Sequence, residues 1–199
     1  MVYDRRRILG GMVAGTAGIV SPRAFAAVKA GERPPLLDEA RAALQSHAGH
    51  IPNRNVVAIA DFSRNSGDAR FHLVDIAGGR VLESYLVSHG RGSDPRNTGW
   101  VQSFSNRPGS NATSRGAYVT SNEYSGKHGR SRRLIGLDPE NNLAMPRAIV
   151  IHSASYVNRN MATNHGRVGR SEGCFAVSRD VIHEVLTRLG PGSLLYAGR

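Results

Sequence analysis

The pattern of hydrophobic and polar positions predicts a mainly β domain that begins near residue 55. Residues 56–60 form a short apolar run that is typical of a buried strand. Two further strand patterns, 71–75 and 81–87, flank a turn signal at 77–79, so we expect a β-hairpin there. The remaining strand patterns lie at 116–120, 133–137, 148–152 and 194–196.

Two segments have the spacing of amphipathic helices. Residues 36–47 place apolar side chains at positions 36, 37, 40, 43 and 44, which predicts a helix on the outside of the domain. Near the C-terminus, Ser178 is expected to cap a helix that runs to about Leu189, with Asp180 in its first turn. Between the strand patterns, residues 88–115 are rich in Gly, Pro, Ser and Asn. They predict a long irregular loop, and such loops often carry function.

The first 26 residues have the organisation of an export signal. Consecutive arginines at 5–7 precede a mildly apolar run, Pro22 ends that run, and Ala24-Phe25-Ala26 has the form of a signal-peptidase site. Arginines before a weakly hydrophobic run are typical of twin-arginine export. A basic N-terminal arm on a cytosolic protein is the alternative. We therefore predict a signal peptide over 1–26, a linker and helix over 27–54, and a folded domain over 55–199 of a periplasmic or secreted protein.

Charge narrows the choice of partner. The net charge of the 199-residue chain is +11, and it falls to +8 without residues 1–26, because four arginines and one aspartate are lost. No apolar run reaches the roughly 18–20 residues that a membrane-spanning helix needs. Export argues against nucleic acid, and a positive field concentrates acidic wall polymers such as carboxylate-bearing glycopeptides. The alternative is that the positive charge binds no partner and serves only to keep the protein soluble.

The chain has one cysteine, Cys174, and its surroundings suggest reactivity. A lone thiol in an oxidising compartment is either buried and inert or kept for its chemistry. Ser, Glu and Gly flank Cys174, whereas an inert cysteine usually lies within an apolar run. Arg167, Arg170 and the start of the predicted C-terminal helix are expected to favour the thiolate, while Glu172 opposes it.

A nucleophilic cysteine needs a base, and His152 is the best of the eight histidines. It ends an apolar strand pattern, so the sheet would fix its position. His165, in a predicted loop, is the competing base. The alternative for His152 is a purely structural role at the end of the strand. Metal chemistry is not indicated, because no ligand pair of histidines or second cysteine is present. No cofactor motif is found either.

At these residues the chain resembles the murein L,D-transpeptidase catalytic domain family, a group of YkuD-like cysteine transpeptidases. The shared features are a strand-end histidine, His152, followed by Ser-x-Gly-Cys at 171–174. Four further motifs occur in the family's order: Ser-Asn-x-x-Gly-Ser at 105–110, Gly-x-Tyr-x-Thr at 116–120, Tyr-x-Gly-Lys-His-Gly at 124–129 and Arg-Leu-x-Gly-Leu at 133–137. The resemblance covers about residues 55–197. It implies an L,D-transpeptidase-like β-sandwich or barrel with peripheral helices, one N-terminal and one after the cysteine loop.

The resemblance also implies roles for individual residues. Cys174 would be the nucleophile, and His152 the general base and acid, oriented by the Ser153 carbonyl. The N–H groups of Gly173 and Cys174 would bind the oxyanion. Substrate-binding roles would fall on Tyr156, Arg170, Ser171, Tyr124 and His128.

The implied activity is peptidoglycan L,D-transpeptidation through a thioester, with release of a terminal D-amino acid. An L,D-carboxypeptidase or another cysteine hydrolase that acts on murein is an alternative, as is an inactive wall-binding module. Papain-like enzymes place Cys before His, and the Thr-x-Thr-Cys context of sortases is missing. Glu172, Phe175 and Ala176 depart from the family pattern. A carboxylate at 172 would raise the pKa of the thiol unless it were paired, with Arg170 as the suggested partner. The sequence indicates no oligomeric state.

Overall fold

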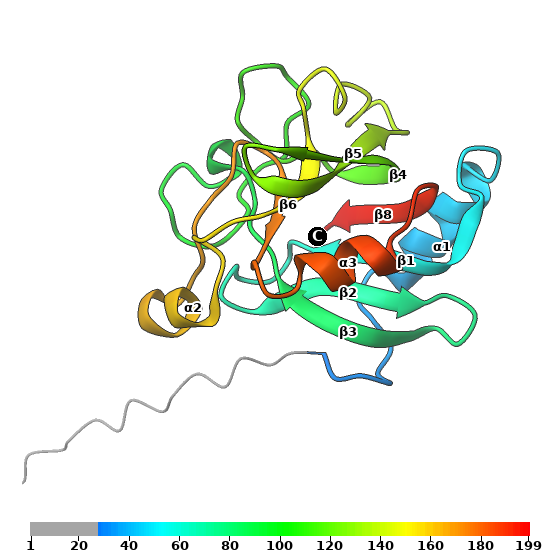
Figure 1. The fold of residues 1–199 in the computed structure, drawn as a ribbon, viewed down its shortest axis with the longest axis horizontal. Coiled ribbons are helices and arrows are strands. Elements are labelled where there is room, and N and C mark those ends of the chain that lie inside the picture. The colour runs from blue at the N-terminus through cyan, green and yellow to red at the C-terminus, as the bar shows by residue number, and fades with distance from the viewer. Residues whose placement is uncertain (1–27) are drawn as a thin grey trace, which may run out of the picture.

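The computed structural model of the protein describes residues 28–199, so the predicted export signal lies outside the described residues (Figure 1). Within this range eight strands form one mixed sheet, and three α-helices pack around it. The strands are β1 (Asn53–Asp61), β2 (Ala69–Asp75), β3 (Arg80–Leu86), β4 (Gly116–Gly126), β5 (Gly129–Gly136), β6 (Val150–Ser153), β7 (Phe175–Val177) and β8 (Ser193–Gly198). The helices are α1 (Leu37–Ser46), α2 (Arg159–His165) and α3 (Ile182–Arg188). The predicted mainly β class is confirmed.

The strand order across the sheet is β3-β2-β1-β8-β4-β5-β6-β7. β2 and β3 form the predicted antiparallel hairpin, and β4 and β5 form a second one. The last strand, β8, inserts between β1 and β4, where it runs parallel to β1. β6 and β7 are also parallel and end the sheet on the other side. As predicted, residues 88–115 are irregular apart from one short 3-10 helix, Arg91–Ser93.

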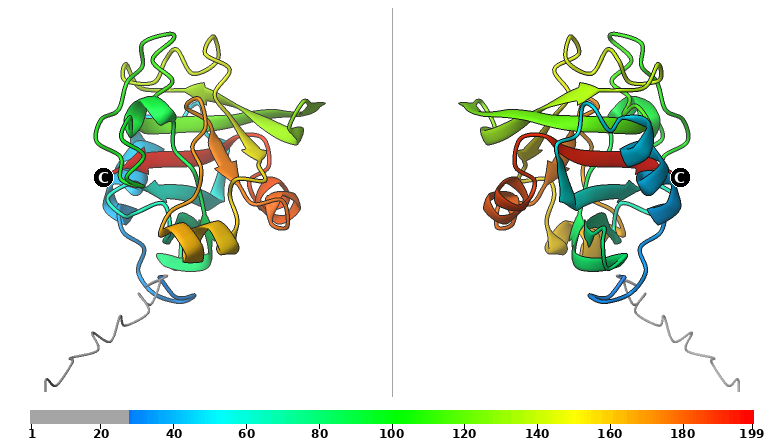
Figure 2. Two further views of the ribbon diagram at one scale, coloured as in Figure 1. Left: turned by 90° about the vertical axis from the view of Figure 1, so that its left-hand side faces the viewer. Right: turned by 90° about the vertical axis from the view of Figure 1, so that its right-hand side faces the viewer.

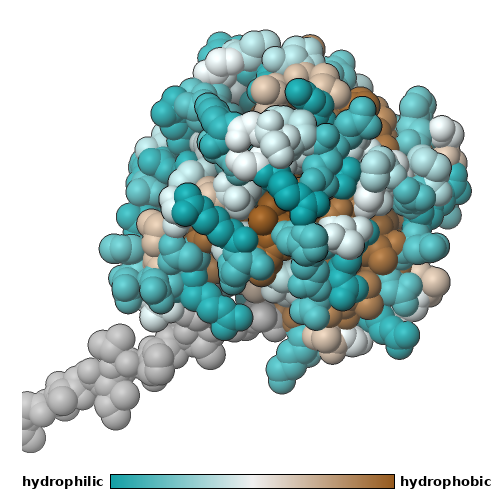
Figure 3. Space-filling model, in the orientation of Figure 1, coloured by the Kyte–Doolittle hydropathy of each residue, from teal (hydrophilic) through white to brown (hydrophobic). Residues whose placement is uncertain are grey.

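The alternation of side chains on β1 divides the interior into two layers. Ala58 and Ala60 point into the main core, while Val57 and Ile59 point to the other face, against α1. The main core also contains residues of β4 to β8 and the buried side of α3. Figure 2 shows α1 and α3 on opposite sides of the molecule. Hydrophilic residues cover most of the face drawn in Figure 3, with smaller hydrophobic areas between them.

The helices differ from the sequence predictions in two places. Helix α3 begins at Ile182 and not after Ser178, so the predicted cap is wrong; the Ser178 hydroxyl instead bonds the Asp180 carboxylate. Helix α2 was not predicted, although Asn158 caps it by accepting a hydrogen bond from the Met161 N–H at 2.8 Å. Across residues 28–199, no helix combines the length and the apolar character needed to cross a bilayer.

Candidate active site

The pairing of β6 with β7 sets the geometry of the site. In this parallel pair Ile151 lies opposite Phe175, and both side chains belong to the main core. Because successive side chains on a strand point to opposite faces, His152 and Cys174 both project from the other face. There they line one cavity of about 490 Å³.

Seven of the nine predicted site residues line this cavity: Tyr124, His128, His152, Tyr156, Arg170, Ser171 and Cys174. The two others adjoin it in the chain. Ser153 follows His152 and lines a neighbouring cavity, and Gly173 precedes Cys174. The competing base, His165, ends helix α2 and does not line the cavity.

The His152 imidazole is held by its neighbours on both sides. Its exposed fraction is 2%, and its Nδ1 lies 2.9 Å from the Ser153 carbonyl oxygen. A proton on Nδ1 therefore donates to that carbonyl and leaves Nε2 as an acceptor. The ring of His128 stacks on it with centroids 4.3 Å apart. Burial lowers the pKa of His152, and the nearby His128 and Lys127 lower it further, so the imidazole is neutral at pH 7.

The Cys174 thiol is half-buried and points to the backbone of the segment before β6. Its Sγ donates to the Ala148 carbonyl oxygen at 3.5 Å. Within residues 28–199, the hydrogen bonds of Sγ do not include one to the His152 imidazole. Burial raises the pKa of the thiol, and Glu172 raises it further, against the lowering effects of the Val150 N–H, Arg147 and Lys127. The predicted lowering of the thiol pKa is therefore wrong.

The predicted help from a helix N-terminus is also wrong. Strand β7 separates Cys174 from α3, which begins eight positions later in the chain, at Ile182. The effect of a helix dipole falls off within the first turn, so it cannot stabilise a thiolate there.

Ser171 fixes the loop that carries the thiol. Its hydroxyl donates to the Cys174 carbonyl at 2.7 Å and accepts from the Gly173 N–H at 3.1 Å. The Ser171 backbone also bonds His89 and Arg91, which belong to the long loop. The Gly173 N–H, one of the two predicted oxyanion donors, is therefore already engaged by Ser171; the Cys174 N–H is the other predicted donor.

Glu172 pairs with a different arginine from the one suggested by the sequence. Its carboxylate lies 3.0 Å from the Arg91 guanidinium, while Arg170 donates to the Asp94 carbonyl. Both members of the Glu172–Arg91 pair line the cavity and are exposed. The pair therefore lies at the cavity mouth, where solvent screens it.

Sequence reasoning missed three cations that line the cavity: Arg91, which pairs with Glu172, and also Arg147 and Lys127. The Arg147 guanidinium donates to the Ser105 carbonyl at 2.8 Å and to the Ser114 hydroxyl at 2.6 Å. These partners lie more than 30 residues away in the chain, so no local pattern marks Arg147. Lys127 lies beside His128 in the Tyr-x-Gly-Lys-His-Gly motif, and that position was its only signal.

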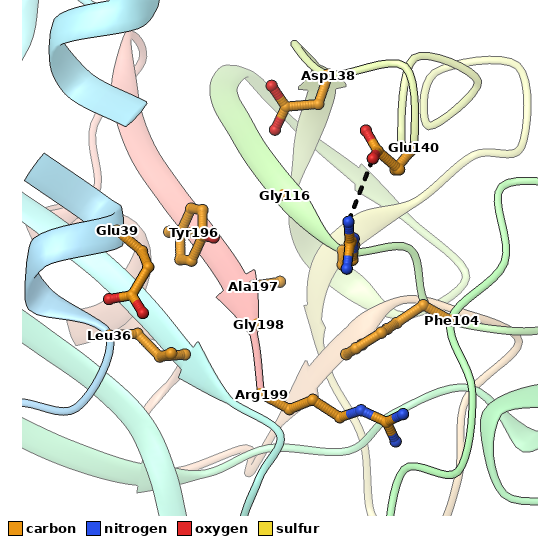
Figure 4. Close-up of a pocket in the computed structure, with 11 residues that line it drawn as sticks. Leu36, Glu39, Phe104, Gly116, Asp138, Glu140, Tyr196, Ala197, Gly198 and Arg199 are labelled. Carbon is orange, nitrogen blue, oxygen red and sulfur yellow. Dashed lines mark hydrogen bonds and ion pairs between the residues drawn. The ribbon is translucent and has the colours of Figure 1, made fainter. Parts of the chain in front are cut away.

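Another cavity, of about 470 Å³, lies at the opposite end of β4 (Figure 4). Its acidic side chains are largely paired: Asp138 with His47 at 2.8 Å and Glu140 with Arg115 at 3.3 Å. Neither a cysteine nor a histidine lines it. The cavity around Cys174 is therefore the candidate active site.

A family model described as "L,D-transpeptidase catalytic domain" matches residues 29–197. Similar solved structures include an L,D-transpeptidase from Mycobacterium smegmatis, with 14% identity and a TM-score of 0.43, which covers 73% of this chain and 59% of that one. L,D-transpeptidase 3 from Mycobacterium tuberculosis has 14% identity and a TM-score of 0.45, and the match covers 73% of this chain and 61% of the other. An L,D-transpeptidase from Xylanimonas cellulosilytica has 17% identity and a TM-score of 0.42, and the match covers 80% of this chain and 69% of the other. The chain thus spans less than two thirds of the first two structures. No curated protein matches it.

Proposed function

Because the chain belongs to the L,D-transpeptidase catalytic domain family, we propose that it is a cysteine acyltransferase that acts on peptidoglycan stem peptides. Cys174 is the nucleophile in this proposal, and His152 is the general base and acid. The observation that carries the proposal is the placement of the only cysteine and an oriented imidazole on one face of β6 and β7, in one cavity. Such a pair, with a third group that orients the base, is the signature of an activated nucleophile.

The first half of the reaction forms a thioester. Nε2 of His152 takes the thiol proton while Sγ bonds to the carbonyl carbon between a diamino acid and the terminal D-residue. The Cys174 N–H donates to the oxyanion that develops on the carbonyl oxygen. The carbon–nitrogen bond then breaks, and the leaving amine of the D-residue takes the proton from His152.

The second half regenerates the thiol. An amine from a neighbouring stem attacks the thioester carbonyl, passes a proton through His152 to sulfur and forms a new amide cross-link. If water attacks in its place, the product is a shortened stem with a free carboxylate, and the enzyme is an L,D-carboxypeptidase. The same two side chains serve both outcomes.

The electrostatics of the cavity indicate when the proton moves. Burial raises the pKa of Cys174 and lowers that of His152, so thiol and imidazole are both neutral at rest. The thiol must also turn from the Ala148 carbonyl toward Nε2 before it reacts. Proton transfer therefore accompanies attack on bound substrate, which is general-base catalysis.

We also propose that the protein works outside the cytoplasm, in the periplasm or after secretion. The pattern of residues 1–26 supports this location, since arginines, an apolar run and a small-x-small site follow one another in the order of an export signal. N-terminal sequencing of the protein recovered from the producing cell tests it: a mature start near Ala27 is expected, and an intact N-terminus would contradict it.

Mass spectrometry of the purified protein with a synthetic tetrapeptide stem tests the proposed reaction. We expect loss of the terminal D-residue and a stem-acyl adduct on Cys174. Cys174→Ala should abolish both, His152→Gln should reduce turnover by at least about a hundredfold, and His165→Gln, the matched histidine control, should leave it unchanged. Turnover that survives in Cys174→Ala would refute the proposal.

An inactive wall-binding module is the second candidate, and one observation favours it. The thiol has a raised pKa and bonds a carbonyl oxygen, not the imidazole. Stem binding by the wild-type protein without any adduct or released D-residue would identify this function.

A further inference from the structure

A neighbouring cavity of about 380 Å³ adjoins the catalytic cavity. The two share Lys127, His128 and Tyr156 as a common wall. The Ser153 hydroxyl donates to the His128 carbonyl at 3.4 Å, which joins the tip of the β4–β5 hairpin to the end of β6. The volume lies within the range of roughly 300–1,000 Å³ that is common for ligand pockets.

The charge of this cavity is positive and uncompensated. Lys127 and Arg179 line it, and no carboxylate does. Among residues 28–199 neither side chain has an ion-pair partner. Asp180, next to Arg179, is bonded by Ser178 and does not line the cavity. In the other two cavities acidic side chains accompany the cations: Glu172 in the catalytic one, and Asp138 and Glu140 in the one shown in Figure 4. An uncompensated positive pocket attracts an anion.

The position of the neighbouring cavity indicates which part of a substrate reaches it. Cys174 lines the catalytic cavity alone, and Ser153 lines the neighbouring cavity alone. His152 lines the catalytic cavity and directly precedes Ser153 in β6, and its ring stacks on that of His128, which lines both cavities. The acyl carbon must lie at the thiol, and the leaving amine must lie at the imidazole that protonates it. A leaving residue that extends past His152 on the side of His128 reaches the neighbouring cavity.

We propose that the neighbouring cavity binds the terminal carboxylate of the leaving D-residue, with Lys127 and Arg179 as the residues that determine specificity. This inference rests on the proposed function, because it takes the orientation of the stem from the acyl-transfer reaction. Its consequence is exo-specificity: the enzyme acts on stems that end in a free carboxylate and discriminates against stems whose end is capped.

Two synthetic tetrapeptide stems that differ only in a C-terminal carboxylate or carboxamide test the inference. We expect the wild-type protein to favour the acid in kcat/KM. Arg179→Gln should reduce the acid-to-amide ratio roughly ten- to 150-fold, which corresponds to the roughly 1.5–3 kcal/mol of one hydrogen bond to a charged group. Lys127→Gln combined with it should bring the ratio close to one.

Arg107→Gln is the matched control. Arg107 is exposed, lines none of the three cavities and carries the same charge, so its variant should keep the wild-type ratio. The rate of Cys174 alkylation by neutral iodoacetamide, unchanged in Arg179→Gln, shows that the site is intact. An acid-to-amide ratio that is the same in Arg179→Gln and the wild type would overturn the inference.

Binding separates a failure of this inference from a failure of the proposed function. The Cys174→Ala protein binds without chemistry, so calorimetry with the acid and amide stems reads the carboxylate site directly. Preference for the acid that depends on Arg179 supports the inference even if no thioester forms in the wild type. Equal affinity for the two stems would overturn it even if the thioester does form.

Discussion

Among single residues, Cys174 shows how strongly burial competes with nearby charge. Four cations line its cavity, yet the pKa of the thiol is raised, because desolvation of the thiolate exceeds their attraction. Arg91 is paired with Glu172, and Arg147 and Arg170 donate to backbone carbonyls, so part of the positive charge is already used. The thiol is thus protected at rest and becomes reactive when substrate and imidazole are both in place.

The pH dependence of alkylation tests this state of Cys174. In the protein without substrate, the rate of reaction with iodoacetamide should rise with a midpoint above the ~8.5 of an unperturbed thiol. Glu172→Gln should move the midpoint down by a few tenths of a pH unit, because it removes a negative charge that solvent already screens. Glu140→Gln, whose carboxylate lies in the distant cavity, should leave the midpoint in place. A wild-type midpoint below 8.5 would contradict the raised pKa.

Gly173 is required by the backbone of the nucleophile loop. Its φ is +118°, and a Cβ there would lie 2.7 Å from the Ala112 carbonyl oxygen. Gly173→Ala should therefore lower the free energy of unfolding by about 1–3 kcal/mol and abolish turnover. Urea unfolding measures the first effect. Gly190→Ala is the control, since a Cβ at that position has open space around it, and comparable losses in the two variants would count against this explanation.

At the scale of elements, two residues with side chains suited to capping behave differently: one caps a short helix and the other does not. Asn158 caps α2, whereas Ser178 bonds only Asp180 and lies four residues before α3. Asn158→Ala should destabilise the protein by about 1 kcal/mol, and Ser178→Ala by less than about 0.5 kcal/mol. Urea midpoints at constant slope measure both. The opposite order would contradict this account of the two side chains.

Seven of the eight strands were predictable because their hydrophobic period is local; β7, which has only three residues, was not predicted. The β2–β3 hairpin and β8 lie close to their predicted ranges, and helix α1 follows its apolar spacing. Strands β4 and β5 were predicted too short, since their outer halves are mostly polar and carry no apolar alternation, and their pairing as a hairpin was not predicted. Helix α2 escaped notice because its seven residues include one buried side chain, Ala162, too few to produce a period.

The candidate site also has features that the sequence marks and features that it does not. The lone cysteine and the strand-end histidine are marked in the sequence, and parallel pairing of β6 with β7 brings them to one cavity. The orientation of the thiol, the Glu172–Arg91 pair and the contacts of Arg147 depend on segments distant in the chain. Those contacts are consequences of packing, and no pattern of neighbours in sequence encodes them.

At the scale of the whole molecule, a buried polar cluster connects the sheet to the site. The fully buried Arg70 donates to the Val87 carbonyl at 3.0 Å and lies 2.7 Å from Nδ1 of His89. A guanidinium that donates to Nδ1 requires a neutral His89, whose Nε2–H then faces Asp94 at 3.5 Å. The His89 carbonyl in turn accepts from the Ser171 N–H, so the cluster supports the loop that carries the nucleophile.

This cluster and His72 predict acid lability. Burial lowers the pKa of His89 to about 3 and that of His72 to about 4, from 6.5. Between pH 6.5 and 4 the unfolded chain therefore binds protons that the folded protein does not. The stability that these two histidines contribute is complete above pH 6.5 and is lost as the pH falls below it. Each contributes a slope that approaches 1.4 kcal/mol per pH unit, so the free energy of unfolding should fall by several kcal/mol between pH 7 and 4.

Urea unfolding at pH 7, 6, 5 and 4 measures this slope. His72→Gln should reduce it, because the variant no longer has a group whose pKa differs between the folded and unfolded states, even if it lowers stability uniformly. His165→Gln, at an exposed position, should keep the wild-type slope. A free energy of unfolding that stays constant from pH 7 to 4 would contradict this prediction, because it would mean that the folded protein accommodates a charged His89. The arrangement of Arg70, His89 and Asp94 would then not stabilise the nucleophile loop as described. Because Ser171 bonds to the His89 backbone, the loss of stability in acid should be accompanied by loss of thioester formation over the same pH range.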